Sequence, residues 1–211
     1  MIKIAQFGEG NFLRTFVDYY FENLNVESGK KDYSVSIIKP ITFGTLEKFH
    51  AQNNKYNIVM ELKEILNRRR STRKFLAGKV EHDKLQRIVD MALQAPSSRN
   101  SRSTRLIVVE DAELLEKMSQ MRDYGSSFMK DAQAAIVVMG DKEASDLWLD
   151  NCVITATILQ LAVVDEGLAS CWVHVNGRPC LKDEPEGAKA DDYLRKLLDL
   201  PTHYGILCAV A

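Results

Sequence analysis

The sequence lacks the cysteine patterns that mark zinc sites or disulfide frameworks. Its four cysteines stand at positions 152, 171, 180 and 208, and none forms a Cys-x-x-Cys pair. Cys152 and Cys208 lie inside apolar runs, which is typical of buried, reduced thiols in a cytoplasmic protein. We therefore predict no metal site, no disulfide and a cytoplasmic location.

The chain also lacks an excess of charge of either sign. Its 28 Lys and Arg residues against 29 Asp and Glu residues give a formal net charge of −1. Because general nucleic-acid binding rests on an excess of positive charge, this balance argues against that function. A hydrophobic content of 45% and a charged content of 27% predict an ordinary soluble globular protein. The local arginine clusters must then serve a smaller ligand or lie in solvent.

A long, uninterrupted apolar run is missing as well. The N-terminus has no signal-peptide core, since the apolar run there is short and ends in glycines. The most apolar segment spans residues 147–164, and we interpret it as a buried helix. It is interrupted by too many polar residues for a membrane span, namely Asp150, Asn151, Thr155, Thr157 and Gln160.

The first sixty residues read as a β-α-β unit. A strand is expected at Ile2–Phe7, followed by Gly8-x-Gly10, a helix, and a second strand at Tyr33–Ile38. Glycines at a strand-to-helix turn let phosphate approach helix N–H groups. The signal is weak, because the third glycine of the dinucleotide pattern is absent.

This segment resembles the tagaturonate reductase branch of the mannitol dehydrogenase family. The resemblance rests on QFGEGNFLR at residues 6–14 and on IKPITFGTLEKFHAQNNKYNIV at residues 38–59. About sixty residues cannot complete a doubly wound sheet or enclose a dinucleotide. We therefore interpret residues 1–59 as an incomplete Rossmann-like fragment in which Gly8 and Gly10 are relics. A nicotinamide-dependent hexonate or polyol dehydrogenase is the weakest functional alternative.

The sequence changes character near residue 60, and residues 60–211 mix helices and strands without strict alternation. This predicts an α+β fold in which helices pack on a sheet. Helices are expected at 61–70, 82–94, just after Asp111, at 144–165 and at 191–198. Strands are expected at 106–109, 134–139, 169–175 and 204–210.

Two basic, hydroxyl-rich stretches bracket the helix expected at 82–94. They read RRRSTRKF at residues 68–75 and APSSRN at residues 95–100. Guanidinium groups of Arg69, Arg70 and Arg73 can pair with phosphate oxygens in bidentate fashion. The Ser71 hydroxyl and the Asn100 amide can add hydrogen bonds to a sugar or a ring edge. A solvated basic helix face accounts for the spacing equally well.

Three longer motifs resemble the nitroreductase family of flavoproteins. They are RRSTRKF, APSSRNSRSTRLIVVED and DNCVITATILQLAVVDEGLASCWV, and the match covers about 70% of the chain. The resemblance implies a mostly antiparallel sheet flanked by helices, in a nitroreductase-like FMN-binding domain at residues 60–211. It also implies a homodimer, formed mainly through the 144–165 helix, with FMN at the interface.

The resemblance further implies which residues meet the flavin. Arg69, Arg70, Ser71 and Arg73 would contact the ribityl phosphate and the flavin edge. Pro96, Ser97, Ser98 and Asn100 would approach the flavin, often from the partner subunit, and Trp172, Val173 and His174 would lie against the isoalloxazine ring. The flavin itself carries the chemistry, so no catalytic side chain is expected. NAD(P)H would give a hydride, and a nitroaromatic, quinone or similar acceptor would take the electrons by ping-pong exchange.

The sequence departs from the family pattern in two places. Family members often read Asn-Ser-Gln-Pro-Trp where this chain has Asn100-Ser101-Arg102-Ser103-Thr104. Members also continue past the last strand into a tail that wraps the partner, whereas this sequence stops at Ala211. The alternative expectation is therefore a non-catalytic, flavin-deficient remnant of the same fold.

Overall fold

Two short parallel strands make up the described part of the first sixty residues. The computed structural model describes residues 2–7, 33–38 and 61–211. Strand β1 (Ile2–Phe7) pairs in parallel with β2 (Tyr33–Ile38), and the register runs from Ile2 opposite Tyr33 to Phe7 opposite Ile38. Both strands were predicted, and their parallel pairing suits the expected β-α-β unit. The Gly8-x-Gly10 turn and the helix after it lie outside the described residues.

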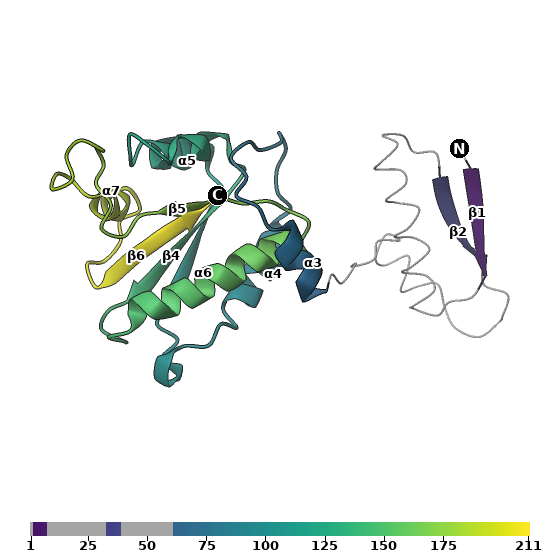
Figure 1. The fold of residues 1–211 in the computed structure, drawn as a ribbon, viewed down its shortest axis with the longest axis horizontal. Coiled ribbons are helices and arrows are strands. Elements are labelled where there is room, and N and C mark those ends of the chain that lie inside the picture. The colour runs from purple at the N-terminus through teal and green to yellow at the C-terminus, as the bar shows by residue number, and fades with distance from the viewer. Residues whose placement is uncertain (1, 8–32, 39–60) are drawn as a thin grey trace. The chain divides into compact units, whose positions relative to one another are not determined.

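The chain divides into two compact units, Met1–Met60 and Glu61–Ala211. The second unit begins with α3 (Leu62–Arg68) and ends with β6 (Tyr204–Val210), as the ribbon in Figure 1 shows. It contains the predicted candidate residues at 69–73, 96–100 and 172–174. The candidate site therefore lies in this unit.

A four-stranded antiparallel sheet forms the centre of the second unit. Its order is β3 (Thr104–Val109), β4 (Ala135–Asp141), β6 and then β5 (Trp172–His174). The central strands β4 and β6 are nearly continuous apolar runs and are buried along almost their whole length, as strands covered on both faces must be. Strands β3 and β5 form the edges. The predicted α+β fold with a mostly antiparallel sheet is confirmed.

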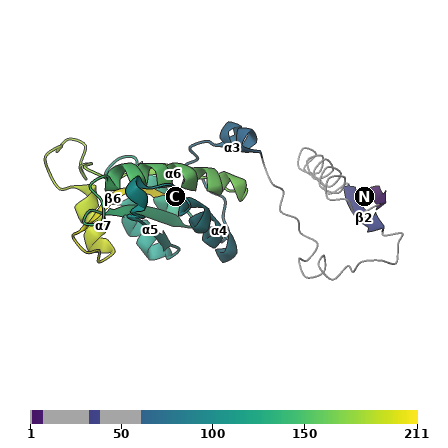
Figure 2. The same ribbon diagram turned by 90° about the horizontal axis from the view of Figure 1, so that it is seen from below.

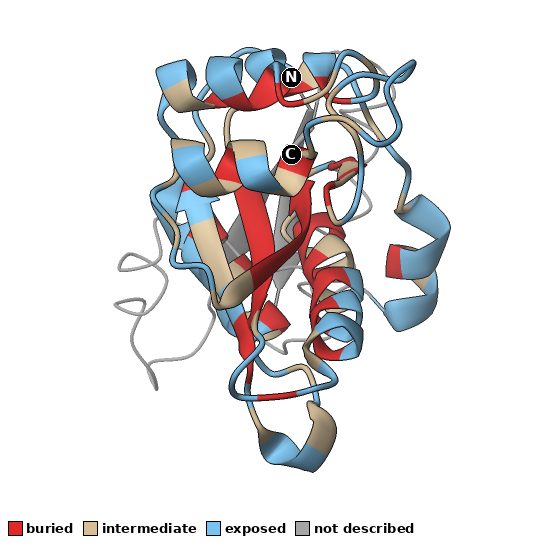
Figure 3. Cartoon of the chain, turned by 90° about the vertical axis from the view of Figure 1, so that its left-hand side faces the viewer, coloured by how far each residue is buried: buried red, intermediate tan, exposed pale blue. Residues whose placement is uncertain are grey.

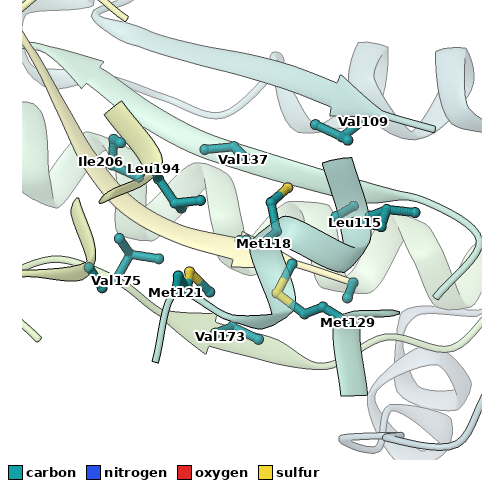
Figure 4. Close-up of a cluster of buried hydrophobic side chains, with 14 of the residues drawn as sticks. Val109, Leu115, Met118, Met121, Met129, Val137, Val173, Val175, Leu194 and Ile206 are labelled. Atoms are coloured by element: carbon teal, nitrogen blue, oxygen red, sulfur yellow. The ribbon is translucent and has the colours of Figure 1, made fainter. Parts of the chain in front are cut away.

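Helices cover both faces of this sheet. On one face α4 (His82–Ala92) and α6 (Trp148–Asp165) pack over the sheet through a cluster that includes Ile88, Leu159 and Cys208. On the other face lie α5 (Ala112–Ser119), η2 (Ser127–Asp131) and α7 (Ala190–Leu197). Figure 2 shows α6 and α5 on opposite sides of the sheet. The second cluster contains three fully buried methionines, which Figure 4 shows among Val137, Val173 and Ile206.

The ends of several elements differ from those predicted. Helix α5 begins after Asp111 as expected, because the Asp111 carboxylate accepts a hydrogen bond of 2.8 Å from the Leu114 amide. Helix α6 begins at Trp148 rather than Ala144, because the Asp141 carboxylate binds the amides of Glu143 and Ala144 in a turn. Strand β5 has three residues instead of seven, since Ser170 turns to pair with Ser71.

The long helix α6 has one face on the sheet and one face in solvent. Figure 3 shows buried residues on the side of α6 that meets the sheet and exposed residues on its outer side. Cys152, Ala156 and Leu159 are fully buried there. From its polar residues, this segment is predicted not to span a membrane. By length and composition alone, however, α6 is long and apolar enough to do so. Its packing shows that it is the core helix of this unit.

The outer side of α6 carries large apolar side chains. Leu149, Val153 and Ile154 keep 38%, 43% and 39% of their surface exposed. On the nearby helix α3, Leu62 and Leu66 are exposed as well. Exposed apolar side chains gathered on one side of a helix mark surfaces that contact another molecule.

Candidate functional site

The segment Arg69–Arg73 is extended rather than helical. Helix α3 ends at Arg68, and Arg69 already has non-helical backbone angles, with φ −54° and ψ 123°. The segment then lies beside Ser170, because the Thr72 amide donates a hydrogen bond of 3.0 Å to the Ser170 carbonyl and Ser71 forms a parallel bridge with Ser170. The helix expected over 61–70 is therefore too long at its C-terminal end. These arginines therefore do not lie on a helix face as the alternative interpretation supposed, although Arg70 and Arg73 are exposed to solvent.

Alternation along this extended segment separates its side chains into two sets. Residues two apart point to the same side of an extended chain, so Arg69, Ser71 and Arg73 share one side. Burial raises the pKa of the Cys171 thiol, while the charge of Arg73 and a hydrogen bond with Ser71 partly offset that rise. Ser71 and Arg73 therefore lie beside Cys171, at the start of β5.

Arg70 points away from this group. Its Nη1 donates hydrogen bonds to the carbonyls of Asn67, at 2.6 Å, and of Arg69, at 2.8 Å. The guanidinium thus satisfies carbonyls at the C-terminal end of α3, where helices leave such groups without partners. Thr72 and Lys74 line a separate apolar cavity of about 580 Å³. The structure therefore brings Ser71 and Arg73 together beside Cys171 and leaves Arg70 outside, while alternation along the segment assigns Arg69 to the Ser71 side.

Two aromatic rings stand side by side on the edge strand β5. The rings of Trp172 and His174 are stacked with an interplanar angle of 11° and a centroid separation of 6.2 Å. The indole Nε1 donates a hydrogen bond of 3.4 Å to Nδ1 of His174. Val173, between them, is only 1% exposed and packs into the cluster on the opposite face. Only its backbone can face a ligand that lies on the Trp172 and His174 side.

Two arginines, Arg122 and Arg178, lie near His174. Burial lowers the pKa of His174, and the charges of Arg178 and Arg122 lower it further. The lowered pKa favours the neutral form of the imidazole. Arg122 also fixes the backbone here, because its Nη1 donates a hydrogen bond of 3.0 Å to the His174 carbonyl. Two arginines thus lie near the end of β5, an arrangement that suits an anionic ligand.

The Pro96–Asn100 stretch lies at the N-terminal end of α6. It contains the short helix η1 (Ser98–Asn100), and the Ser98 amide donates a hydrogen bond of 2.8 Å to Oδ1 of Asn151. Ser97 is half-buried and its hydroxyl accepts a hydrogen bond of 2.9 Å from the Arg102 amide, while Pro96 and Asn100 are exposed.

The two predicted groups of residues therefore lie at opposite ends of α6. Helix α6 has 18 residues, which at about 1.5 Å per residue is roughly 27 Å. The start of α4 sits at the C-terminal end of α6, since Arg87 and Glu166 form a bidentate ion pair with both distances at 2.7 Å. The chain reaches the N-terminal end only after α4, as Figure 1 shows. Within one protomer Arg69–Arg73 and β5 come together, but Pro96–Asn100 does not join them.

Two residues in this part of the chain were not recognised from the sequence. In the sequence Asn151 is only an interruption of an apolar helix, yet its side chain binds Ser98 in the 96–102 loop and Ser103 at the entry to β3. Arg122 was not noted, because nothing local marks its contact with His174, 52 residues away. A polar residue in an otherwise apolar helix is the signal that could have identified Asn151. Among residues 61–211, no group of three His, Cys, Asp or Glu side chains converges to hold a metal ion.

Comparison with known proteins accounts for both parts of the chain. The nitroreductase family profile matches residues 66–122 and 118–211. A protein of Methanothermobacter thermautotrophicus, provisionally named NADH dehydrogenase/NAD(P)H nitroreductase, is 32% identical over 147 residues, which cover 68% of this chain and 72% of that protein. The structure of an FMN-dependent nitroreductase from Clostridium difficile R20291 has a TM-score of 0.66 and 39% identity, with 70% of this chain and 83% of that chain covered.

A third relative corresponds to the N-terminal resemblance. The altronate oxidoreductase of Bacteroides thetaiotaomicron is 39% identical over 59 residues, which cover 28% of this chain and 12% of that enzyme. This short match agrees with the fragment of a mannitol dehydrogenase-type enzyme expected at residues 1–59. The family match over residues 66–211 covers well over half of the sequence and coincides with the α+β unit that contains the candidate site. The chain belongs to the nitroreductase family of oxidoreductases.

Proposed function

We propose that this chain is an FMN-dependent oxidoreductase that acts as a homodimer in the cytoplasm. It takes a hydride from NAD(P)H and reduces a nitroaromatic, quinone or similar small acceptor by ping-pong exchange. The observation that carries the proposal is the placement of Ser71 and Arg73 beside the start of β5, the strand that carries the stacked rings of Trp172 and His174. Alternation along the extended segment assigns Arg69 to the same side.

The donor set at this place fits FMN. Arg69 and Arg73 form no ion pair within residues 61–211, so their charge is available for a phosphate. Guanidinium groups bind phosphate oxygens through short, charge-assisted hydrogen bonds. The Ser71 hydroxyl lies between them in sequence and can bind a neutral edge of the cofactor. The half-buried rings of β5 offer an apolar surface for a planar ring system.

The protein's part in the reaction is to bind, orient and polarise. Bound FMN would supply the redox chemistry, accepting a hydride and passing electrons on. Arg69 and Arg73 favour whichever form of a bound ligand has more negative charge, since opposite charges attract. Arg122 keeps the backbone of β5 in place through the His174 carbonyl. The lowered pKa of His174 favours its neutral form, whose Nδ1 accepts the hydrogen bond from the Trp172 indole.

The separation of the two motifs supports a dimeric site. Pro96–Asn100 lies at the other end of α6 from Arg69–Arg73, so one protomer does not bring both to the same ligand. A twofold axis across the outer side of α6 would place opposite ends of the two copies side by side. Leu149, Val153 and Ile154 give that side the apolar surface such an interface needs.

A visible absorption spectrum tests the proposal. The purified chain is mixed with FMN, passed through gel filtration and examined anaerobically before and after NADH or NADPH is added. Bound-flavin bands that bleach with either nucleotide, in a fraction of dimer size, support the proposal. A colourless monomer would overturn it in favour of a flavin-deficient remnant. Tight NAD binding without flavin would instead support a dehydrogenase activity of residues 1–59.

A further inference from the structure

We infer that Asn151 is a positioning residue that holds the loop from Pro96 to Arg102 in the shape in which it reaches the partner protomer's flavin. The inference rests on the proposed function, since it concerns the same flavin site. It assigns a role to a polar side chain of α6 that lies in the core.

Asn151 ties the loop to the helix through both atoms of its amide. It is 2% exposed, and its Oδ1 accepts a hydrogen bond of 2.8 Å from the Ser98 amide. Its Nδ2 donates to the hydroxyls of Ser103, at 3.0 Å, and Ser101, at 3.3 Å. The Ser145 hydroxyl lies at 3.5 Å from Nδ2 and at 3.2 Å from the Ser98 hydroxyl. One side chain thus joins the loop, the entry to β3 and the turn before α6.

The loop has a conformation that needs such an anchor. Arg99, Asn100 and Arg102 have φ angles of 50°, 53° and 45°, in the left-handed region that side chains disfavour. Non-glycine residues hold these angles only where their surroundings determine the structure. The Ser97 hydroxyl supplies one hydrogen bond, to the Arg102 amide. Contacts from outside the loop come from Asn151, Ser145 and Arg105. The Ser98 amide donates to Asn151, the Ser98 hydroxyl lies 3.2 Å from that of Ser145, and Arg105 Nη1 donates a hydrogen bond of 2.6 Å to the Arg102 carbonyl. Of these, the bond to Asn151 is the one in which a buried side chain binds the loop's backbone.

Packing alone does not account for an amide at this position. Burying an amide is unfavourable unless its hydrogen bonds are satisfied, and an apolar side chain of similar size would fill the space. A satisfied polar network instead specifies one arrangement of the segments that it joins. Thr155, one turn later on the same face, is equally buried but binds Thr104 and the Asn151 carbonyl, with no bond to the loop. It is a matched control.

In a dimer, the loop of one protomer would contribute to the flavin site of the other protomer. The loop and Arg69–Arg73 of one protomer lie at opposite ends of α6. In the twofold dimer, the loop held by Asn151 therefore completes the site whose arginines come from the partner. Loss of Asn151 in one protomer should lower the FMN affinity of the site whose arginines come from the other protomer.

The first experiment measures FMN affinity and thermal stability in three variants. Asn151→Ala should weaken FMN binding by about tenfold or more, because the loop loses its anchor and buried groups lose partners. Asn151→Asp should recover most of the affinity, since the carboxylate still accepts from Ser98 and the serine hydroxyls can turn to donate. Thr155→Val should lower stability while leaving the FMN Kd unchanged. Equal losses of affinity in Asn151→Ala and Thr155→Val would mean a purely structural role and overturn the inference.

The second experiment mixes two defective homodimers. Asn151→Ala protomers are unfolded and refolded together with Arg69→Ala/Arg73→Ala protomers. Each mixed dimer then has one site with intact arginines and an intact loop, and one site lacking both. Random pairing should restore about a quarter of the wild-type flavin sites at wild-type affinity. No recovery would overturn the action of Asn151 across the interface.

The wild-type chain separates the two ways of failing. A wild-type protein that retains no FMN overturns the proposed function and, with it, the role of Asn151. If the wild-type protein binds FMN and Asn151→Ala binds it with the same affinity, the proposed function stands and only the inference is overturned.

Discussion

Gly140 of β4 lies directly opposite Gly205 of β6, and the indole of Trp148 covers this glycine pair. A Cβ atom on Gly140 would come within 2.8 Å of Cε3 of the Trp148 ring. One on Gly205 would come within 2.6 Å of Cζ2 and 2.7 Å of Cζ3. Real Cβ atoms are essentially never this close to their neighbours. The two glycines therefore create the space that seats the first residue of α6 on the sheet.

We predict that Gly205→Ala destabilises the protein by about 1–3 kcal/mol, the usual cost of overpacking a filled site. The added methyl would overlap an indole ring backed by two strands, so the ring or the strands must shift. Urea unfolding of the variant and of the wild type gives the difference in free energy of unfolding.

A double-mutant cycle supplies the control for this prediction. In a Trp148→Leu background the indole is gone, so Gly205→Ala should cost much less than it does in the wild type. Equal costs in both backgrounds would mean that Trp148 is not the group with which the methyl collides.

The sequence predicted the sheet and its covering helices because those signals are local. The apolar runs of β4 and β6 predict strands that are buried on both faces, and Asp111 predicts the start of α5. What it could not predict depends on contacts between distant segments. Ser170 leaves β5 early to pair with Ser71, 99 positions earlier (170 − 71), and no local pattern indicates this bridge.

The candidate site shows the same division. The motif at residues 69–73 identified the basic segment, but only the bridge to Ser170 shows that it is extended, which separates Arg70 from Arg69 and Arg73. The alternation of side chains along β5 could have placed Val173 in the core, opposite Trp172 and His174. The anchoring of the 96–102 stretch by Asn151 joins positions about fifty residues apart and needed the structure.

A second prediction concerns the ion pair between Arg87 and Glu166. A hydrogen bond from Arg87 lowers the pKa of Glu166 below its ordinary 4.5, and the charges of Arg87 and Lys84 act in the same direction. A carboxylate whose pKa falls on folding stabilises the protein above that ordinary pKa, and this contribution is lost as the pH falls through the lower, folded value. Glu166→Gln should therefore be less stable than the wild type at pH 7.

The stability difference should vanish at pH values well below 4.5, where Glu166 is protonated in both the folded and unfolded protein. Urea unfolding at neutral and acidic pH measures it. Glu113→Gln is the control, since its pairing with Lys117 is a long surface contact of 3.9 Å and should contribute little at either pH. A deficit of Glu166→Gln that stays constant with pH would contradict the assignment.

The cysteines should differ sharply in their reaction with a thiol reagent. Burial raises the pKa of the Cys152 thiol to about 11. The pKa of the Cys208 thiol is also raised, first by burial and then by the nearby Cys152. Because the thiolate is the reactive form, both should react only after unfolding. Cys180 is only half-buried, so it should react first in the native protein. Cys180→Ser should remove this early phase, and urea should release all remaining thiols; an early phase that persists would place the accessible thiol elsewhere.

The last prediction tests the phosphate-binding assignment with charge held constant. Arg69→Ala/Arg73→Ala should weaken FMN binding by at least about a hundredfold, since each guanidinium lost removes a charge-assisted contact with phosphate. Arg70→Ala/Lys74→Ala removes the same two positive charges from the same segment. Arg70 binds carbonyls at the end of α3, and Lys74 lines the cavity on the other side. That variant should retain FMN.

Gel filtration after FMN loading, followed by a spectrum, gives the flavin stoichiometry of each protein, and far-ultraviolet circular dichroism shows that the fold is kept. If both double variants lose flavin equally, the general positive potential binds the cofactor and the side-by-side placement of Arg69 and Arg73 is irrelevant. If only Arg69→Ala/Arg73→Ala loses it, the alternation imposed by the bridge between Ser71 and Ser170 selects which arginines meet the phosphate. We expect the second result, because the bridge fixes the direction of each side chain while the net charge of the segment does not.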